Sequence, residues 1–347
     1  MKAALVGAGQ IAVEHLKALQ GMPTVEIAGV CDLSRAAAES AALRHGATAW
    51  FTDLTEMLRA AKPDVVHVTT SPQSHYSIAV ECLEAGAHVI VEKPITSSLA
   101  ELEDLLERAA TRDLVVLEDY NTIYSIAAQE ILRRIKTGVF GAVVHVEVMY
   151  CLDILGPGGF ADPNAPHPVL TMPGGAIADF LPHLASLAHA FVGPHRAATS
   201  IWQKRRDSLA PFDEFRGLVE GERATAALTF SCSAQPAAFW LRVYGERMRA
   251  TANLFETRLT FTRVREGLGP LGGIVNGLDE GKAIRRAAVQ TFLSKFRSGQ
   301  GGYDGLTEIV RRTYGSIADG TPLPITPQQV REVNLMIDAL RPREVAP

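Results

Sequence analysis

Residues Glu92, Lys93 and Pro94 directly follow an apolar segment, His88–Val91, that has the composition of a buried strand. Proline has no backbone N–H, so the strand should end here and the Lys93 side chain should project beyond the edge of the sheet. An ammonium in this position can bind a hydroxyl group and stabilise a developing alkoxide. The alternative is an ordinary solvated lysine at a strand end, and the residues around it must decide between the two.

A glycine-rich segment, Gly7–Ala12, lies between a second apolar run, Ala3–Val6, and a segment of helical period. It reads G-x-G-x-x-A, the pattern that binds a dinucleotide when it connects a strand to a helix. Gly7 would allow the tight turn, Gly9 the close approach of the pyrophosphate, and Ala12 the packing of helix on strand. Residues Gln10 and Ile11 complete the predicted phosphate site at the helix N-terminus.

Asp32 ends the next apolar run, 20 residues beyond Ala12. This is the place of a carboxylate that binds the ribose hydroxyls of NAD, and its charge should repel the 2′-phosphate of NADP. Arg35 is close enough to weaken that preference, so NADP stays possible. The competing interpretation is that Asp32 only caps the helix that begins near Arg35.

Short apolar runs alternate with helical patterns over residues 1–120, as in repeated βα units around a parallel sheet. The sequence therefore predicts an α/β Rossmann domain over residues 1–120. The predicted strands are Ala3–Val6, Glu26–Cys31, Val65–Thr69, His88–Val91 and Leu114–Leu117, and the predicted helices are Ile11–Leu19, Arg35–Arg44, Leu54–Ala60, His75–Glu84 and Leu99–Thr111.

Strand-like runs follow one another in the second half, which predicts an α+β domain over residues 121–347 with a mainly antiparallel or mixed open-faced sheet. Helices are predicted at Ile126–Lys136, at Ala176–Phe191 and over residues 282–298, 303–319 and 327–341, the last of which could pack back on the first domain. The predicted strands are Ala142–Tyr150, Ala197–Gln203, Phe215–Val219, Thr225–Ser231, Phe239–Tyr244, Arg249–Asn253 and Arg258–Thr262.

The composition narrows the class of protein. A chain of 347 residues is long enough for two domains, and its net charge of −4 argues against a nucleic-acid partner. No run of about 20 apolar residues spans a membrane, and the N-terminus is too polar for a signal peptide. The four cysteines form no C-x-x-C pair, so reduced thiols in a cytoplasm are expected.

Three segments together resemble the glucose-fructose oxidoreductase and inositol dehydrogenase family, Gfo/Idh/MocA. They are Thr70–His75, Glu92–Pro94, and Gly174–His183, which reads G-G-x-x-x-D-x-x-x-H. The resemblance implies that Lys93 lies beside the nicotinamide and the reacting carbon and that Glu92 orients it. It also implies that Thr70, Ser71, Pro72 and His75 lie along the cofactor.

The same resemblance implies that Asp179 contacts the substrate and that His183 acts as the base. Asp179 and His183 are four residues apart, so on a helix they share one face. A histidine, with a reference pKa near 6.5, is suited to accept a hydroxyl proton. The alternatives are a surface pair, or two metal ligands that lack a third; no H-E-x-x-H motif or nearby cysteine supports a metal, so none is predicted. Pro182 could kink this helix.

The segment Glu118–Tyr124 departs from the family pattern, because many relatives have a cation there and this chain has Thr122 and Ile123 instead. Asn121 and Tyr124 remain predicted substrate contacts, and a different substrate from that of the best-known members is expected. In the loop 155–175, Asp162, Asn164 and His167 could cover a sugar or contact another subunit.

The sequence therefore predicts an NAD(P)-dependent oxidoreductase that transfers hydride between nicotinamide and a secondary alcohol or ketone of a sugar, cyclitol or nucleotide sugar. Lys93 and His183 would handle the hydroxyl proton. A homodimer or homotetramer through the C-terminal sheet is expected. Two alternatives remain open, namely an NAD-dependent glycoside hydrolase that oxidises its substrate transiently, and a non-catalytic dinucleotide-binding sensor or regulatory subunit.

Overall fold

The computed structural model describes residues 1–156, 159, 170, 173–207, 210–256, 258–298 and 303–342. The loop residues Asp162, Asn164 and His167 lie outside the described residues. The chain divides into two compact units. Among the described residues, unit 1 comprises Met1–Asn121 and Leu306–Asn334, and unit 2 comprises Thr122–Gly305 and residues 335–342.

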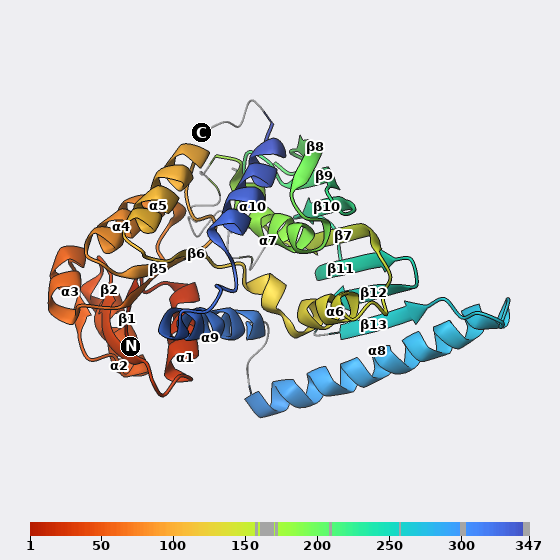
Figure 1. The fold of residues 1–347 in the computed structure, drawn as a ribbon, viewed down its shortest axis with the longest axis horizontal. Helices are drawn as coiled ribbons and strands as arrows, with labels where there is room; N and C mark the ends of the chain where they lie inside the picture. Colours follow the sequence, from red (N-terminus) through yellow and green to blue (C-terminus); the bar gives the residue numbers. More distant parts are fainter. Residues whose placement is uncertain are drawn as a thin grey trace. The chain divides into compact units, whose positions relative to one another are not determined.

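Unit 1 contains a six-stranded sheet in which every pairing is parallel, in the order β3-β2-β1-β4-β5-β6 (Figure 1). The order reverses between β1 and β4, and the carboxyl edge of such a sheet at this switch point is where ligands bind in open α/β folds. The strands are β1 (Lys2–Val6), β2 (Glu26–Cys31), β3 (Trp50–Phe51), β4 (Val65–Val68), β5 (His88–Val91) and β6 (Val116–Glu118).

The helices of unit 1 connect these strands and bury one apolar side each. Three of them begin at a side chain that accepts a backbone N–H, which satisfies part of the helix start: Ser34, Asp53 and Ser98. The connecting helices are α1 (Gln10–Gln20), α2 (Arg35–His45), α3 (Leu54–Ala61), α4 (Pro72–Glu84) and α5 (Leu99–Thr111). Helix α9 (Asp304–Asp319) and most of α10 (Pro327–Ala339) add to this unit from the far end of the sequence.

Unit 2 contains a seven-stranded sheet in the order β13-β12-β11-β7-β10-β9-β8. It is mixed, because β7 and β10 pair in parallel and the other pairs are antiparallel. The predicted fold class is therefore confirmed for both halves. The strands are β7 (Val143–Cys151), β8 (His195–Gln203), β9 (Glu214–Gly221), β10 (Thr225–Ser231), β11 (Ala238–Gly245), β12 (Met248–Asn253) and β13 (Arg258–Arg263).

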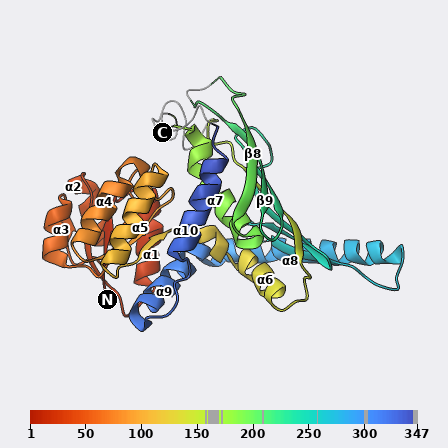
Figure 2. The same cartoon turned by 45° about the horizontal axis from the view of Figure 1, so that its top comes forward.

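One face of this sheet is covered and the other is open. Helices α6 (Ile126–Lys136) and α7 (Gly175–Val192) lie on the same side of the strands (Figure 2). On β9, buried Phe215 and Val219 alternate with exposed Arg216 and Leu218, as in an antiparallel strand with one solvated face. A short 3-10 helix, η1 (Asn121–Tyr124), precedes α6.

Helix α7 is long and apolar enough to cross a membrane, yet 83% of it is buried within the protein. Its buried residues include Phe180, whose ring stacks on Phe230 with the ring centroids 5.1 Å apart. Tyr150 of β7 packs against both rings. The apolar character of α7 is thus explained by its place as the core helix of unit 2.

The structure extends the predicted elements at two places. Helix α8 (Leu271–Ser298) begins eleven residues before the predicted start at residue 282. Gly272, Gly273 and Gly277 lie in this first part, and glycine normally argues against a helix interior. Strand β3 is absent from the prediction, because two residues are too few to show a period.

Candidate active site

The glycine loop connects β1 to α1 and takes the conformation that its sequence requires. Gly7 has a φ of +94°, and its N–H donates to the carbonyl of Cys31 over 2.8 Å. A Cβ atom at Gly7 would lie only 2.7 Å from Cγ2 of Thr70 and 2.8 Å from the carbonyl of Thr69. Only glycine therefore fits at this position.

Gly9 differs from Gly7, because no atom lies within 4 Å of the place where its Cβ would be. It is the N-cap residue of α1, and no side chain caps this helix start. Gln10, Ile11 and Ala12 form the first turn, of which Ala12 is buried against the sheet. The open space above Gly9 and the uncapped N–H groups fit a bound pyrophosphate.

Asp32 lies at the end of β2 and accepts two backbone hydrogen bonds of 2.7 Å. Its Oδ2 accepts from Ala8 of the glycine loop and its Oδ1 from Ser34. The N-cap residue of α2 is Ser34, so Asp32 itself does not cap this helix, and its role toward the ribose hydroxyls stays a prediction. Arg35 points toward Trp50, with its guanidinium 5.0 Å from the ring centroid.

The segment after β4 is held against the glycine loop and against the segment after β5. The hydroxyl of Thr69 donates to the carbonyl of Gly7 over 2.6 Å. His75 is buried, with Nδ1 2.8 Å from the carbonyl of Pro94 and Nε2 3.1 Å from the carbonyl of Thr70. Burial lowers the pKa of His75. Ser71 and Pro72 form the start of α4, where no side chain caps the helix.

Lys93 follows β5 and is half-buried, and Glu92 before it is buried. Oε2 of Glu92 accepts the backbone N–H of Lys93 over 3.1 Å, and Oε1 lies 3.1 Å from Nε2 of His15. The same His15 atom lies 3.9 Å from Oδ2 of Asp119, which follows β6. His15 and Asp119 are absent from the predicted site, although they contact the Glu92-Lys93 segment.

Asp179 and His183 are half-buried on α7, one turn apart, whereas most of this helix is buried. The ring of His183 lies 6.3 Å from the ring of Phe180, and Asp179 contributes to the raised pKa of the buried Tyr150. The two side chains therefore share one helix face within unit 2, as their spacing requires. Lys93 belongs to unit 1, so its meeting with them stays a prediction.

The two remaining predicted residues lie on η1. Asn121 is half-buried and its Nδ2 donates to Oδ2 of Asp119 over 3.1 Å, while Tyr124 is buried. Asn121 is thereby held against the segment that follows β6.

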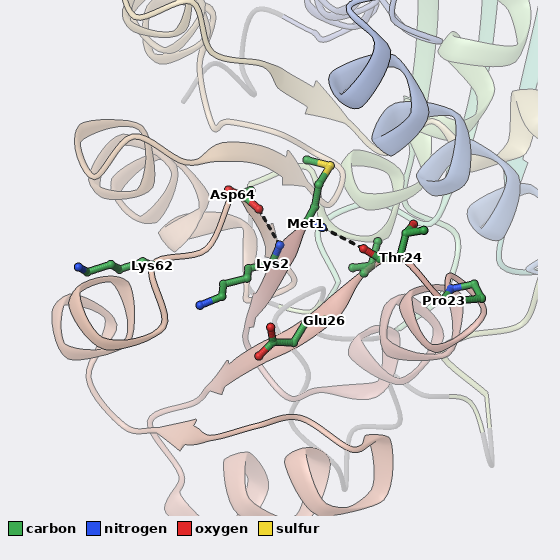
Figure 3. A pocket seen from close by; sticks show the side chains of 8 residues that line it. Met1, Lys2, Pro23, Thr24, Glu26, Lys62 and Asp64 are labelled. Atoms are coloured by element: carbon green, nitrogen blue, oxygen red, sulfur yellow. Dashed lines mark hydrogen bonds between the residues drawn. The ribbon is translucent and has the colours of Figure 1, made fainter.

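A depression at the opposite, amino edge of the unit 1 sheet contains none of these residues (Figure 3). Two hydrogen bonds join its lining residues. The backbone N–H of Lys2 donates to Oδ2 of Asp64 over 2.6 Å, and the N-terminal ammonium donates to the carbonyl of Thr24. Ligands of open parallel sheets bind at the carboxyl ends of the strands, so this depression is not the candidate site.

Two family models match the chain. One, described as "Oxidoreductase family, NAD-binding Rossmann fold", covers residues 1–120, and the other, described as "GFO/IDH/MocA C-terminal domain", covers residues 128–251. Together they cover most of both units.

Curated relatives match over shorter stretches. D-glucoside 3-dehydrogenase of Escherichia coli (strain K12) is 29% identical over 41% of this chain and 41% of its own length. Glycosyl hydrolase family 109 protein 2 of Akkermansia muciniphila is 30% identical over 43% of this chain and 34% of its own length. The chain thus aligns with less than half the length of these relatives.

Solved structures match over nearly the whole chain. GenD2 from gentamicin A biosynthesis, solved in complex with NAD, superposes with a TM-score of 0.76 at 20% identity and covers 98% of this chain and 93% of that one. At this identity the match establishes the fold of both units.

Proposed function

Because the chain belongs to the Gfo/Idh/MocA family of oxidoreductases, whose first domain is an NAD-binding Rossmann fold, we propose that it oxidises a secondary alcohol of a sugar, cyclitol or nucleotide sugar, or reduces the corresponding ketone. The observation that carries this proposal is the position of Lys93. It lies at the carboxyl end of β5. Its backbone N–H donates to buried Glu92, and the carbonyl of the next residue, Pro94, faces the ring of buried His75.

The residues of unit 1 fit the cofactor. The space above Gly9 accommodates the pyrophosphate, Asp32 binds the adenosine ribose hydroxyls, and Thr70, Ser71 and Pro72 border the rest of the site. His75 contributes by fixing one of the two neighbouring segments, since the single N–H of its neutral ring can donate to the carbonyl of Pro94 or to that of Thr70. When bound there, NAD would supply the acceptor for the hydride of the substrate carbon.

The protein's own groups act on the hydroxyl of the substrate. Lys93 donates a hydrogen bond to this oxygen and stabilises the negative charge that grows on it. His183 accepts the proton, and Asp179 holds either the substrate or the imidazolium that results. Asn121 and Tyr124 contribute substrate contacts.

We assign cofactor binding to unit 1 and substrate binding and self-association to unit 2. The open sheet face carries exposed apolar side chains, among them Ile201 and Leu218, that a second copy would cover in a homodimer or homotetramer. A cytoplasmic location is proposed because all four cysteines are free and buried.

A second candidate is supported by the relative named as a family 109 glycosyl hydrolase. Such an enzyme would oxidise its substrate transiently and regain the cofactor in its oxidised form, so no NADH would accumulate. The third candidate, a dinucleotide-binding sensor, would need neither Lys93 nor His183.

The test is a screen of D-glucosides, myo-inositol and UDP-N-acetylglucosamine for NADH formation, repeated with Lys93→Met. Removal of the catalytic ammonium should lower kcat/KM by about 10²–10⁴-fold while NADH binding is kept. Lys136→Met, which removes an exposed lysine at the end of α6, is the matched control and should retain activity. Undiminished activity of Lys93→Met would refute the mechanism.

A further inference from the structure

Unit 1 contains a continuous row of buried titratable side chains, of which the proposed function uses only Glu92. We call it the buried chain; its members are Asp119, Glu92, His15, His67 and Tyr314, and at most 5% of each is exposed. They come from five different elements, namely the segment after β6, the segment after β5, α1, β4 and α9. Buried groups of this kind are costly unless each has a partner, so their arrangement needs an explanation.

With neutral rings, the hydrogen bonds along the buried chain can all run in one direction. Tyr314 OH lies 3.0 Å from Nε2 of His67, whose Nδ1 lies 2.8 Å from Nδ1 of His15. Two facing imidazole nitrogens need one proton between them. If the phenol donates to His67, His67 donates to His15, and Nε2–H of His15 donates to Glu92, every bond is satisfied by neutral rings. Burial and the neighbouring His15 lower the pKa of His67, which agrees with a neutral ring.

The carboxyl groups at the other end differ in their surroundings. Glu92 accepts from the Lys93 N–H at one oxygen and lies against His15 at the other, so donors stabilise its ionised form. Asp119 shares a hydrogen bond with Glu92, and burial and the charge of Glu92 raise its pKa. Its Oδ1 has no hydrogen-bond partner among the described residues. A buried, bare carboxylate oxygen is strongly unfavourable, whereas a neutral acid tolerates it.

A metal ion is the alternative occupant, since ligand atoms of His15, Glu92 and Asp119 all lie within 4.8 Å of one another. The positive charge of Lys93 acts on Asp119, so a divalent ion would lie beside a cation. The backbone N–H of Lys93 already occupies one oxygen of Glu92. The geometry therefore favours a proton over a metal between the carboxyl groups.

We propose that the buried chain positions Lys93 and keeps one negative charge beside it, with the charge on Glu92 and the proton on Asp119. Asp119, His15, His67 and Tyr314 are then positioning residues, which act on the reaction only through Glu92 and Lys93. The significance for catalysis rests on the proposed function, but the arrangement of charge and proton does not. A fixed negative charge favours the ammonium form of Lys93, the form that binds and stabilises a substrate oxygen.

The test compares two near-isosteric variants by the rate at which trinitrobenzenesulfonate labels the Lys93 amine, followed by mass spectrometry of its peptide. Glu92→Gln removes the charge, which lowers the pKa of Lys93; a shift of one unit raises labelling at pH 8 about tenfold. Asp119→Asn replaces a carboxyl group that is already neutral, so labelling should change by less than about twofold. Equal acceleration in both variants, or none in either, would overturn the proposal.

A second measurement uses the unmodified protein, so it does not depend on the folding of a variant. In nitrogen-15 NMR of histidine-labelled protein at pH 7, both rings should be neutral, with the proton on Nε2 of His15 and on Nδ1 of His67. An imidazolium at either residue would overturn the proposal. Neither experiment needs a substrate. Full activity of Lys93→Met would refute the proposed catalytic role of Lys93, whereas the expected labelling pattern in Glu92→Gln and Asp119→Asn would leave the assignment of charge and proton intact.

Discussion

Oδ2 of Asp32 accepts a hydrogen bond of 2.7 Å from the backbone N–H of Ala8. This bond joins the end of β2 to the glycine loop, while the other oxygen holds the start of α2 through Ser34. A carboxylate fixed in this way cannot turn aside to admit a 2′-phosphate. The proposed preference for NAD over NADP would thus have a rigid cause.

Asp32→Ala should bring the NADH and NADPH affinities close to each other, because it removes the charge that repels the 2′-phosphate. NADH binding should also weaken, since the variant loses the bond to Ala8. Calorimetric titration with both cofactors measures this. Ser34→Ala, which changes the same turn without a change of charge, should keep the original preference. An unchanged ratio in Asp32→Ala would remove the proposed role.

Gly9→Ala and Gly7→Ala should separate binding from stability. A methyl group at Gly9 meets no protein atom, so the free energy of unfolding should change by less than about 0.5 kcal/mol. The methyl group enters the space proposed for the pyrophosphate, however, and should weaken NADH binding more than about tenfold. Gly7 has a positive φ, and a methyl group there would clash with the backbone of Thr69. The Gly7→Ala variant should therefore lose about 1–3 kcal/mol of stability. Thermal unfolding and calorimetry report the two effects. Normal NADH affinity in Gly9→Ala would contradict the cofactor site.

His183→Asn should lower kcat/KM by about 10²–10⁴-fold, because the proposed proton acceptor is lost, and should leave NADH affinity within about twofold. The measurement is steady-state kinetics on whichever substrate the screen identifies. His145→Asn removes a histidine from the open face of the unit 2 sheet and serves as the control. A variant at His183 that retains full activity would favour the sensor or a different base.

Stability should fall as pH rises from about 4.5 to about 7 because of Glu118. Burial raises its pKa to about 7, above its ordinary value of 4.5, although Ile95, Tyr120 and Asn334 all donate to it. The folded protein therefore binds a proton that the unfolded chain releases, and this stabilisation is lost between about pH 4.5 and 7. Glu118→Gln should remove about 3 kcal/mol of this pH dependence, measured as the difference between the urea-unfolding free energies of the two proteins. Parallel pH profiles would contradict the assignment.

Replacement of Ile201 and Leu218 by glutamate should convert the proposed oligomer to monomers. Their side chains are 61% and 59% exposed, and the pairing of Ile201 with Arg216 places them on the open face. Val144→Glu is the control. Val144 is 57% exposed, but its side chain lies on the other face of the sheet. Sedimentation velocity distinguishes the outcomes. An unaltered oligomer in the double variant would exclude this face as the interface.

The elements that carry the candidate site are predictable because each motif is local. Gly7, Asp32 and Lys93 all lie at strand ends that short apolar runs define, and Asp179 and His183 need only the helical period. The same reasoning fails at the start of α8, where glycines hide a helix that tertiary contact with β13 supports.

The buried chain is not predictable from sequence patterns. His15 and His67 look like ordinary residues of a helix and a strand, and their partners are distant in sequence. Asp119 also gains its raised pKa only from burial beside Glu92. Chemistry that arises from tertiary burial leaves no periodic signal in the sequence.

The hydrogen bond between His67 and Tyr314 spans 247 residues. During synthesis, all six strands of unit 1 leave the ribosome long before α9, so a nascent chain holds a buried imidazole and a buried carboxylate, Glu118, without their partners Tyr314 and Asn334. Unpaired buried groups destabilise a partly made domain, and incomplete domains are prone to aggregate. Unit 1 therefore becomes stable only after α9 and α10 have been synthesised. A chain that ends before these helices should be bound by chaperones and degraded by proteases.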